Sequence, residues 1–324
     1  MRAVRIHEFG GPEVLALENV PTPQPGPGEA LIRVRGAGIN PYEAYIRQGQ
    51  YTFIPPRPFT LGGEGAGDVV ALGPDVSGVQ VGDAVWGSLK GSHAEYALAD
   101  PALLYPKPAN VSYHEAAGLT TAWATAVLGL VTLADMQPGE TVVIHGASGG
   151  VGSAAVQLAH AWGARVIATV GSEAKAATVR ALGADATIDY REQDLAAALQ
   201  AAAPDGAQIV FDGVGGPVFV ASVRGLAPAG RYVLYGGSGG RTIGFEAPEF
   251  YRRNVTLFGF SVASHPRAAE ARATIRERIV PLLAEGKVRG LVDGVFPLAQ
   301  AADAYRRLAS RDAQGKVIID PTLR

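Results

Sequence analysis

The 324-residue sequence contains no cysteine. Disulfide bonds, thiolate metal ligands and a cysteine nucleophile are therefore excluded. No apolar run approaches the ~20 residues that a membrane-spanning helix requires. The N-terminal stretch MRAVRIHEFGGPEV alternates like a strand and lacks the apolar region of a secretory signal. These absences favour a cytoplasmic protein without a membrane partner.

An excess of charge of one sign is also absent. Lysine and arginine together number 28 and aspartate and glutamate 30, which leaves a formal net charge of −2. Nucleic-acid-binding proteins and proteins that bind anionic membranes usually show a basic face, and no run of basic residues suggests one here. A nucleic-acid partner is therefore not expected. The length and the 48% hydrophobic content suit two domains with packed cores.

The first ~115 residues are typical of a β-rich domain, because short strand-like segments alternate with turn residues. The segments PTPQPGPG, IPPRP and GPDVSG have turn or loop composition. The strand candidates between them are VLALENV, EALIRVRGAGI, GAGDVVALG, GDAVWGSL and HAEYALAD.

From about Glu140 the pattern changes to strand and helix in alternation. TVVIHG, RVIATV, ATIDY, QIVFDGV and RYVLYG are the strand candidates. Helices are predicted between them, the first two ending at Gly163 and Gly183 and a later one near LAPAG. After VTLFGFSV, a long helix is predicted around AAEARATIRERIVPLLAEG, and the tail returns to strand, helix and strand. This alternation predicts an α/β fold with a doubly wound parallel sheet of the Rossmann type.

Two glycine clusters compete as phosphate-binding loops. A phosphate loop needs a strand before it and a helix after it, so that the free N–H groups of the helix N-terminus face the anion. HGASGGVG meets this condition, with Gly146, Gly149 and Gly152 at three-residue spacing. FTLGGEGAGDVV is followed by another strand, so its glycines instead predict a close backbone approach or a bulge near a site. The cofactor is therefore assigned to the second cluster.

The residues after the second strand of the alternation favour NADPH over NADH. NAD-binding sites place an acidic residue there to bind the ribose 2′-OH. This sequence has Ser172, and its first acid, Glu173, falls in the following helix. Lys175 and Tyr190 are suited to hold a 2′-phosphate, which a carboxylate would repel.

Taken together, the sequence motifs resemble those of a known family, the zinc-free quinone oxidoreductases (the zeta-crystallin-like branch) of the medium-chain dehydrogenase/reductase superfamily. The segments that carry the resemblance span nearly the whole chain in family order. They are GAGINPYEAYIRQGQY, PFTLGGEGAGDVVALG, GDAVWG with HAEYALAD, AAGLTTAWATA, HGASGGVGSAAVQLA, IDYREQD and GKVIID.

The resemblance implies a GroES-like substrate domain, residues 1–118 and 263–324, wrapped around an inserted NADP-binding Rossmann domain, residues 119–262, with the nicotinamide in a cleft between them. It also implies the residues that contact the cofactor. Those expected at the pyrophosphate are Thr121, Ser148, Gly149, Gly150 and Val151, and those around the 2′-phosphate are Ser172, Lys175 and Tyr190. Those expected along the nicotinamide half are Gly236, Ser238, Phe258, Phe260 and Lys316.

The resemblance also bears on the first glycine cluster, FTLGGEGAGDVV. Zinc-dependent alcohol dehydrogenases of the superfamily carry a zinc-ligating histidine where this chain has Gly63, and a ligating cysteine where it has Asn40. The cysteine-rich lobe that holds their structural zinc is missing. Because the six histidines form no H-x-x-x-H or similar cluster, no metal site is expected.

Without a metal, reduction of a quinone or an activated C=C bond is easier to arrange than oxidation of an alcohol. NADPH delivers hydride, and the negative charge that develops on a conjugated oxygen needs only hydrogen-bond donors. The candidates for donors or for an aromatic wall are Asn40, Tyr45, Arg47 and Tyr51.

Other functions stay open. They are an NADPH-binding, crystallin-like or RNA-associated protein with little turnover, and an enoyl-thioester reductase. A short-chain dehydrogenase is disfavoured because no tyrosine has a lysine four residues later. The resemblance also suggests a homodimer in which strand 255–262 pairs with its symmetry mate, and this sparsely charged strand would make a poor exposed edge.

Overall fold

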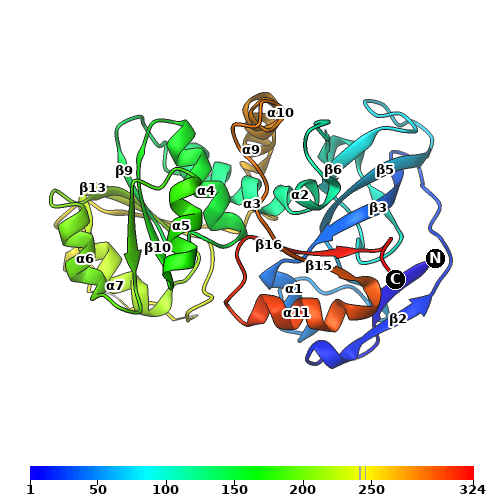
Figure 1. Ribbon diagram of the computed structural model, residues 1–324, viewed down its shortest axis with the longest axis horizontal. Coiled ribbons are helices and arrows are strands. Elements are labelled where there is room, and N and C mark those ends of the chain that lie inside the picture. Colours follow the sequence, from blue (N-terminus) through cyan, green and yellow to red (C-terminus); the bar gives the residue numbers. More distant parts are fainter. Residues whose placement is uncertain (241, 245) are drawn as a thin grey trace. The chain divides into compact units, whose positions relative to one another are not determined.

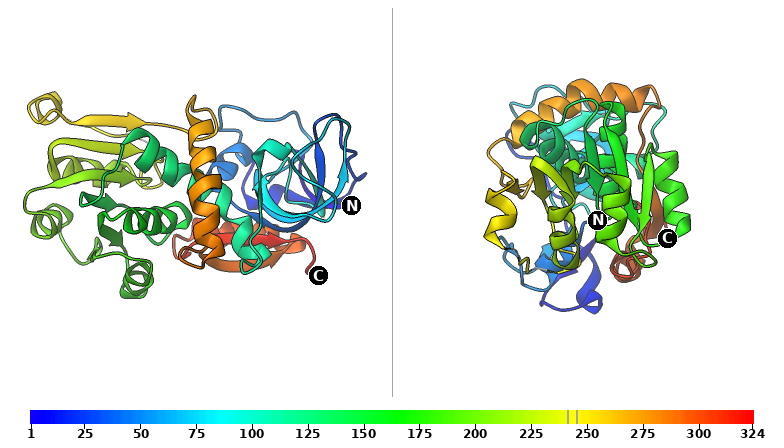
Figure 2. Two further views of the ribbon diagram at one scale, coloured as in Figure 1. Left: turned by 90° about the horizontal axis from the view of Figure 1, so that it is seen from above. Right: turned by 90° about the vertical axis from the view of Figure 1, so that its left-hand side faces the viewer.

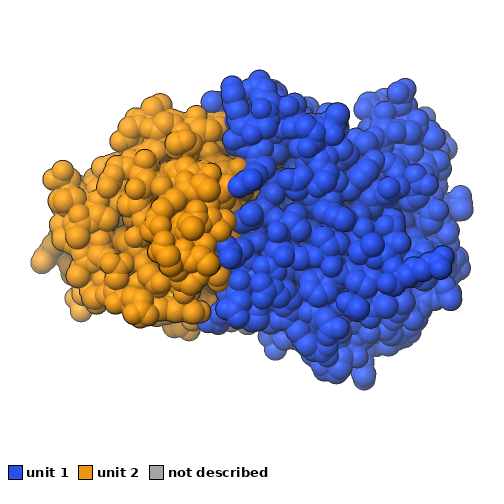
Figure 3. Space-filling model, viewed as in Figure 1, with its two compact units in different colours: residues 1–121, 276–324 blue, residues 122–275 orange. Residues whose placement is uncertain are grey.

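The computed structural model describes residues 1–240, 242–244 and 246–324. The chain divides into two compact units, which Figure 3 colours separately. Unit 1 comprises residues 1–121 and 276–324, and unit 2 comprises residues 122–275. Each is described by itself below. None of the helices in the described ranges is both long and apolar enough to cross a membrane.

Unit 1 is β-rich, as the alternation of short strands with turn residues predicts. Its larger sheet has the order β15–β16–β3–β5–β6–β8, with β7 paired to β3. Its smaller sheet has the order β2–β1–β4. The strands of the larger sheet are β3 (Ala30–Gly38), β5 (Glu64–Leu72), β6 (Ala84–Ser88), β7 (Tyr96–Ala99), β8 (Leu104–Pro106), β15 (Val292–Pro297) and β16 (Lys316–Asp320). Those of the smaller sheet are β1 (Arg2–Ile6), β2 (Leu15–Asn19) and β4 (Phe59–Thr60).

The C-terminal part of the chain completes the larger sheet. Strand β16 pairs with β3 in antiparallel fashion, Ile318 opposite Gly38, and β15 pairs with β16 in parallel. Figure 2 shows β15 and β16 side by side. The helices of unit 1 are α1 (Pro41–Arg47), α2 (Tyr113–Ala117), α10 (Val280–Ala284) and α11 (Ala301–Ala309), with the start of α3 (Leu119–Ala126). The sheet thus joins segments from both ends of the sequence.

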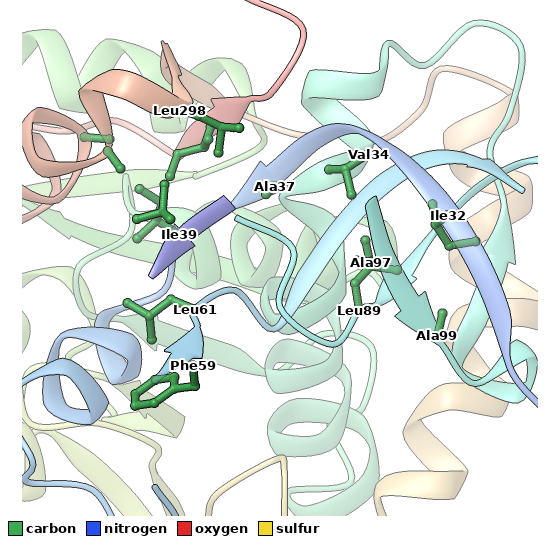
Figure 4. Packing of buried hydrophobic residues seen from close by; sticks show 14 of the residues in the cluster. Ile32, Val34, Ala37, Ile39, Phe59, Leu61, Leu89, Ala97, Ala99 and Leu298 are labelled. Atoms are coloured by element: carbon green, nitrogen blue, oxygen red, sulfur yellow. The ribbon is translucent and has the colours of Figure 1, made fainter. Parts of the chain in front are cut away.

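Apolar side chains from β3, β4, β7 and the C-terminal region pack into the core of unit 1 (Figure 4). Ile32, Ile39 and Leu298 are all 1% exposed or less. Close backbone approach explains two glycines of FTLGGEGAGDVV. A Cβ built on Gly65 would lie 2.7 Å from the Gly36 carbonyl oxygen, and one on Gly67 would fall on the Arg33 carbonyl. The prediction of a close backbone approach in this segment is therefore correct.

Unit 2 is a doubly wound sheet of six parallel strands in the order β11–β10–β9–β12–β13–β14. Strands and helices alternate along the chain (Figure 1). The strands are β9 (Thr141–Ile144), β10 (Arg165–Val170), β11 (Ala186–Asp189), β12 (Ala207–Asp212), β13 (Leu226–Leu234) and β14 (Thr256–Gly259). The helices are α4 (Gly150–Ala161), α5 (Glu173–Ala181), α6 (Leu195–Ala202), α7 (Phe219–Arg224), α8 (Ala247–Tyr251) and α9 (Ala268–Thr274). The predicted α/β fold with a Rossmann-type sheet and a separate β-rich part is confirmed.

Two details differ from the sequence pattern. The helix predicted to end near LAPAG does so, since α7 stops at Arg224, but β13 is longer than the predicted strand RYVLYG, because Leu226 already pairs with Ala207 and the strand includes LAPAG. The sequence pattern predicts no helix for residues 119–133, which form α3 and a π-helical turn with buried residues around it. Helical periodicity is hard to see there because the segment is apolar nearly all round.

Candidate functional site

Three polar side chains from distant parts of the sequence meet inside unit 1. Asn40 precedes α1, Glu64 begins β5 and Lys316 begins β16. The Lys316 ammonium group donates to Glu64 Oε1 at 2.6 Å and to Asn40 Oδ1 at 2.7 Å. The Asn40 amide nitrogen donates to Glu64 Oε1 at 2.8 Å. Glu64 is fully buried, and its charge is matched by that of Lys316.

The other oxygen of Glu64 binds the backbone. The Thr121 N–H donates to Glu64 Oε2 at 2.7 Å, and the Ser92 hydroxyl donates to the Glu64 carbonyl at 2.7 Å. The structure therefore brings together three predicted site residues, Asn40, Thr121 and Lys316, around one carboxylate. We call this group the Glu64 cluster.

A second buried carboxylate, Glu43, lies beside the Glu64 cluster. It accepts hydrogen bonds from the Gly63 N–H at 3.1 Å, the Asn40 N–H at 3.3 Å and the Tyr305 hydroxyl at 2.9 Å. Burial raises the pKa of Glu43 to about 7, against the opposing effects of the Tyr305 hydrogen bond and the Lys316 charge. Glu43 is thus poised to change protonation near neutral pH.

His93 is fully buried against the same group, with Nε2 3.7 Å from Glu43 Oε2. Burial first, and then the charge of Lys316, lower the pKa of His93 to about 3. The imidazole is therefore neutral at physiological pH.

The predicted donors of α1 and the loop after it have different surroundings. The side chain of Arg47 is turned into the protein, with its guanidinium carbon 5.1 Å from the centre of the Tyr305 ring, and the residue is 4% exposed. Tyr45 and Tyr51 are half-buried. The Tyr51 ring lies 5.7 Å from the ring of Tyr42. Arg47 thus packs against Tyr305 and is not part of the Glu64 cluster.

Sequence reasoning missed Glu43, Glu64 and Tyr42. Glu64 lies inside the glycine cluster that contains Gly63, and a charged residue among small residues at the start of a strand is a usable sign of a buried polar site. Nothing in the sequence indicated a site at Glu43, because a glutamate at the third position of a helix is typical of a capping box.

The glycine loop of unit 2 has the form that a pyrophosphate requires. It connects β9 to α4, and the N–H groups of Gly150 and Val151 donate no hydrogen bond within residues 1–240, 242–244 and 246–324. Free N–H groups at a helix N-terminus bind phosphate oxygens. A Cβ on Gly152 would lie 2.7 Å from Ala147 Cα, so only glycine lets α4 pack this closely on the loop. Ser148 is buried in the same turn.

The end of β10 carries the residues predicted for a 2′-phosphate. Ser172 caps α5 by accepting the Lys175 N–H at 3.4 Å. Gly171 is in close contact with the end of the next strand, since a Cβ there would lie 2.7 Å from the Tyr190 hydroxyl and 3.1 Å from Arg191 Nε. Tyr190 and Arg191 therefore reach the same turn as Ser172. The first acid is turned elsewhere, because Glu173 binds Arg180 at 2.6 Å.

Four of the residues predicted along the nicotinamide half lie at the C-terminal ends of β13 and β14, whereas Lys316 lies in the Glu64 cluster of unit 1. The Ser238 N–H and hydroxyl both donate to the Gly213 carbonyl at 3.1 Å, and Gly236 lies against the same carbonyl. Phe258 is half-buried in β14, and the ring of Phe260 lies 6.4 Å from that of Tyr235. In a doubly wound sheet, ligands bind at this edge.

Over the ranges that the structure describes, no three His, Asp or Glu side chains are grouped as a metal ion would need. At the two positions where zinc-dependent relatives carry ligands, Asn40 is held by Glu64 and Lys316, and Gly63 has no side chain. Neither position offers a histidine or thiolate donor.

Comparison with known proteins gives the family. Residues 26–109 match the model of the alcohol dehydrogenase GroES-like domain, and residues 150–283 match that of the zinc-binding dehydrogenases. Quinone oxidoreductase of Mus musculus is 32% identical over 98% of this chain and 97% of its own length.

Among solved structures, an NAD-dependent alcohol dehydrogenase has a TM-score of 0.90 and 32% identity, covering 99% of both chains. The Escherichia coli quinone oxidoreductase complexed with NADPH has a TM-score of 0.89 and 28% identity, covering 99% of this chain and 100% of its own. Together with the fold and the motifs, these matches show that the chain belongs to the quinone oxidoreductases of the medium-chain dehydrogenase/reductase superfamily, a family of NADPH-dependent oxidoreductases.

Proposed function

We propose that this protein reduces quinones, or the activated C=C bonds of enones and alkenals, with NADPH and without a metal ion. One observation carries the proposal. The positions that bind zinc in related alcohol dehydrogenases hold Asn40 and Gly63, and the Asn40 side chain is committed to Glu64 and Lys316. The residues present suit the stabilisation of a carbonyl oxygen by hydrogen bonds and not by a Lewis acid.

The residues of unit 2 fit NADPH. The N–H groups at the start of α4 would bind the pyrophosphate, with Ser148, Gly149, Gly150 and Val151 forming the turn. Ser172, Lys175 and Tyr190, joined by Arg191, would hold the 2′-phosphate. Gly236, Ser238, Phe258 and Phe260 would line the nicotinamide half. When bound, NADPH supplies a hydride from C4 of its nicotinamide ring.

The overall reaction with a quinone consumes one NADPH and one proton and yields the hydroquinone and NADP⁺. Unit 1 would bind the acceptor and orient its reacting atom. In a hydride transfer without a metal ion, this orientation supplies a large part of the rate acceleration. The Lys316 ammonium group has three N–H donors and uses two on Asn40 and Glu64 among the described residues. The third is suited to a polar group of the bound molecules.

The proposed catalytic roles of the α1 region differ between its residues. Tyr45 and Tyr51 are half-buried aromatic side chains suited to form a wall for a planar acceptor. Arg47 would act through Tyr305 and Glu43, and so would be a positioning residue. We assign acceptor binding to residues 1–118 and 263–324 and nucleotide binding to residues 119–262.

The test is oxidation of NADPH, followed by its absorbance, with 9,10-phenanthrenequinone, 1,4-naphthoquinone, simple enones and crotonyl-CoA as separate acceptors. We expect turnover with quinones or enones. Turnover confined to crotonyl-CoA would identify an enoyl-thioester reductase instead. Tight binding of NADPH without turnover of any acceptor would identify a nucleotide-binding protein and overturn the proposal.

A further inference from the structure

Tyr42 occupies the space that a side chain at position 63 would fill. A Cβ built on Gly63 would fall on the Tyr42 hydroxyl oxygen, with Tyr42 Cζ at 3.5 Å and Glu43 Oε1 at 3.9 Å. Position 63 is where the related zinc enzymes carry a metal ligand. The phenol oxygen of Tyr42 therefore occupies the space where the side chain of that ligand would begin.

The Tyr42 hydroxyl differs from the polar groups around it. Asn40, Glu43 and Glu64 are all engaged in hydrogen bonds within the protein. In the part of the chain that the structure describes, the Tyr42 hydroxyl makes no hydrogen bond. Its oxygen is also not one of the fully buried side-chain atoms that lack a hydrogen-bond partner. It is thus an accessible donor at the rim of the buried cluster.

The surroundings of Tyr42 keep its hydroxyl protonated and fix its ring. Burial first, and then the carboxylates of Glu43 and Glu64, raise the pKa of Tyr42 well above its ordinary value. The Tyr51 ring lies 5.7 Å away and limits the movement of the phenol. A neutral, oriented O–H group stabilises an oxygen that gains negative charge.

We propose that Tyr42 is a substrate-binding residue whose hydroxyl donates a hydrogen bond to the acceptor's carbonyl oxygen. The inference rests on the proposed reductase function and deepens it. Transfer of a hydride, with its two electrons, from bound NADPH would break the C4–H bond of the nicotinamide and form a C–H bond on the conjugated acceptor, whose carbonyl π electrons would move onto the oxygen. The Tyr42 hydrogen bond stabilises the resulting oxyanion while Tyr42 keeps its own proton. A proton from solvent then completes the reduced product.

The pairing of residues 42 and 63 follows from the same geometry. Only glycine at position 63 leaves room for the phenol oxygen, so the two residues act as one unit. The atom in conflict belongs to a side chain and not to the backbone, so an alanine at position 63 would force the phenol out of its packed position without moving the backbone. Gly63→Ala and Tyr42→Phe should therefore have the same consequence by different routes.

The experiment compares Tyr42→Phe, Gly63→Ala and the double variant in steady-state and single-turnover kinetics with 1,4-naphthoquinone. We expect kcat to fall by ~10- to 100-fold in each single variant, since one oxyanion donor is lost. The double variant should lose no more than Tyr42→Phe alone. The dissociation constant of NADPH, from fluorescence titration, and Tm should stay close to the wild-type values.

Tyr251→Phe is the matched control, because Tyr251 is 62% exposed on α8 and should tolerate the same change without effect. If the wild type reduces the quinone and the kcat of Tyr42→Phe lies within twofold of the wild-type value, the inference is overturned and the proposed function stands. If the wild type reduces no acceptor at all, both the proposed function and the inference are overturned.

Discussion

The ammonium group of Lys316 lies 2.6 Å from the carboxylate of Glu64, across 252 residues of sequence and inside the core of unit 1. A buried charge that loses its partner is costly, whereas a pair replaced as a whole need not be. We expect Lys316→Met to lower the free energy of unfolding by about 3–5 kcal/mol. The double variant with Glu64→Gln should recover much of that loss, as measured by urea denaturation.

The control for this prediction is the pair between Lys90 and Glu29, where the Lys90 side chain is 66% exposed. Lys90→Met should cost about 1 kcal/mol or less, because water screens an exposed pair. Equal destabilisation by Lys316→Met and Lys90→Met would show that the buried pair does not hold unit 1 together.

Glu43 gives the stability of the protein a pH dependence of defined sign. Its pKa in the folded protein is about 7, above its ordinary value of 4.5, so the folded state favours the protonated acid. The contribution is complete below about pH 4.5 and is lost as pH rises through about 7. The free energy of unfolding of the wild type, minus that of Glu43→Gln, should therefore fall by a few kcal/mol over this range.

Subtracting the free energy of unfolding of Glu43→Gln from that of the wild type removes the pH dependence that His93 contributes, which has the opposite sign. Its pKa is lowered to about 3, so its contribution is complete above about pH 6.5 and is lost at lower pH in both proteins. Urea denaturation at pH 5, 6, 7 and 8 provides the measurement. A constant difference between wild type and variant would mean that Glu43 is ionised throughout.

Lys175 and Arg191 should select for the 2′-phosphate of NADPH. Lys175 belongs to α5, and Arg191 reaches the Gly171 turn. Lys175→Ala and Arg191→Ala should each weaken NADPH binding by ~10-fold or more and change NADH binding little, because a charge-assisted hydrogen bond is lost only with NADPH. Fluorescence titration with both nucleotides is the test, and Lys287→Ala, at an exposed ion pair with Glu285, is the control. Equal losses for the two nucleotides would argue against a phosphate site.

We also predict a homodimer formed by residues 255–262. Strand β14 is the last in the order of the unit 2 sheet, paired in the described ranges with β13 on one side. An uncharged edge of this kind invites pairing with a second copy. A Cβ on Gly259 meets nothing within 4 Å, so Gly259→Lys should leave the monomer folded and shift the protein toward monomer by blocking the edge.

Light scattering at micromolar concentration measures this shift. Ala197→Lys adds the same charge to an exposed position of α6 and should leave the mass unchanged. If the wild type is a monomer at this concentration, the prediction of a homodimer is wrong.

Much of the fold was predictable because local patterns and tertiary structure agree. The parallel sheet of unit 2 follows from apolar segments such as TVVI and RVIATV, each followed by a helix, and glycine ends the first two helices at Gly163 and Gly183. The early start of β13 was not predicted, because proline and glycine in LAPAG favour a turn locally, while pairing with β12 extends the strand through this segment.

The candidate site was predictable only in part. Asn40 and Lys316 were found from motifs, but their contact depends on β16 pairing with β3, which no local pattern reveals. Glu64 and Glu43 were missed because a carboxylate in a glycine-rich strand or in the first turn of a helix has common structural explanations. The relationship of Tyr42 to Gly63 is visible only in three dimensions, since it concerns space that a missing side chain leaves open.

The placement of β16 has a consequence for biosynthesis. Until residues 316–320 emerge from the ribosome, β3 lacks the strand that covers it at Gly38, and the Glu64 carboxylate has no cation to balance its charge. Unit 2, whose last residue is Ile275, is synthesised in full before that point. Domains tend to fold as they are completed. The nascent chain therefore carries a complete unit 2 while unit 1 still lacks β16.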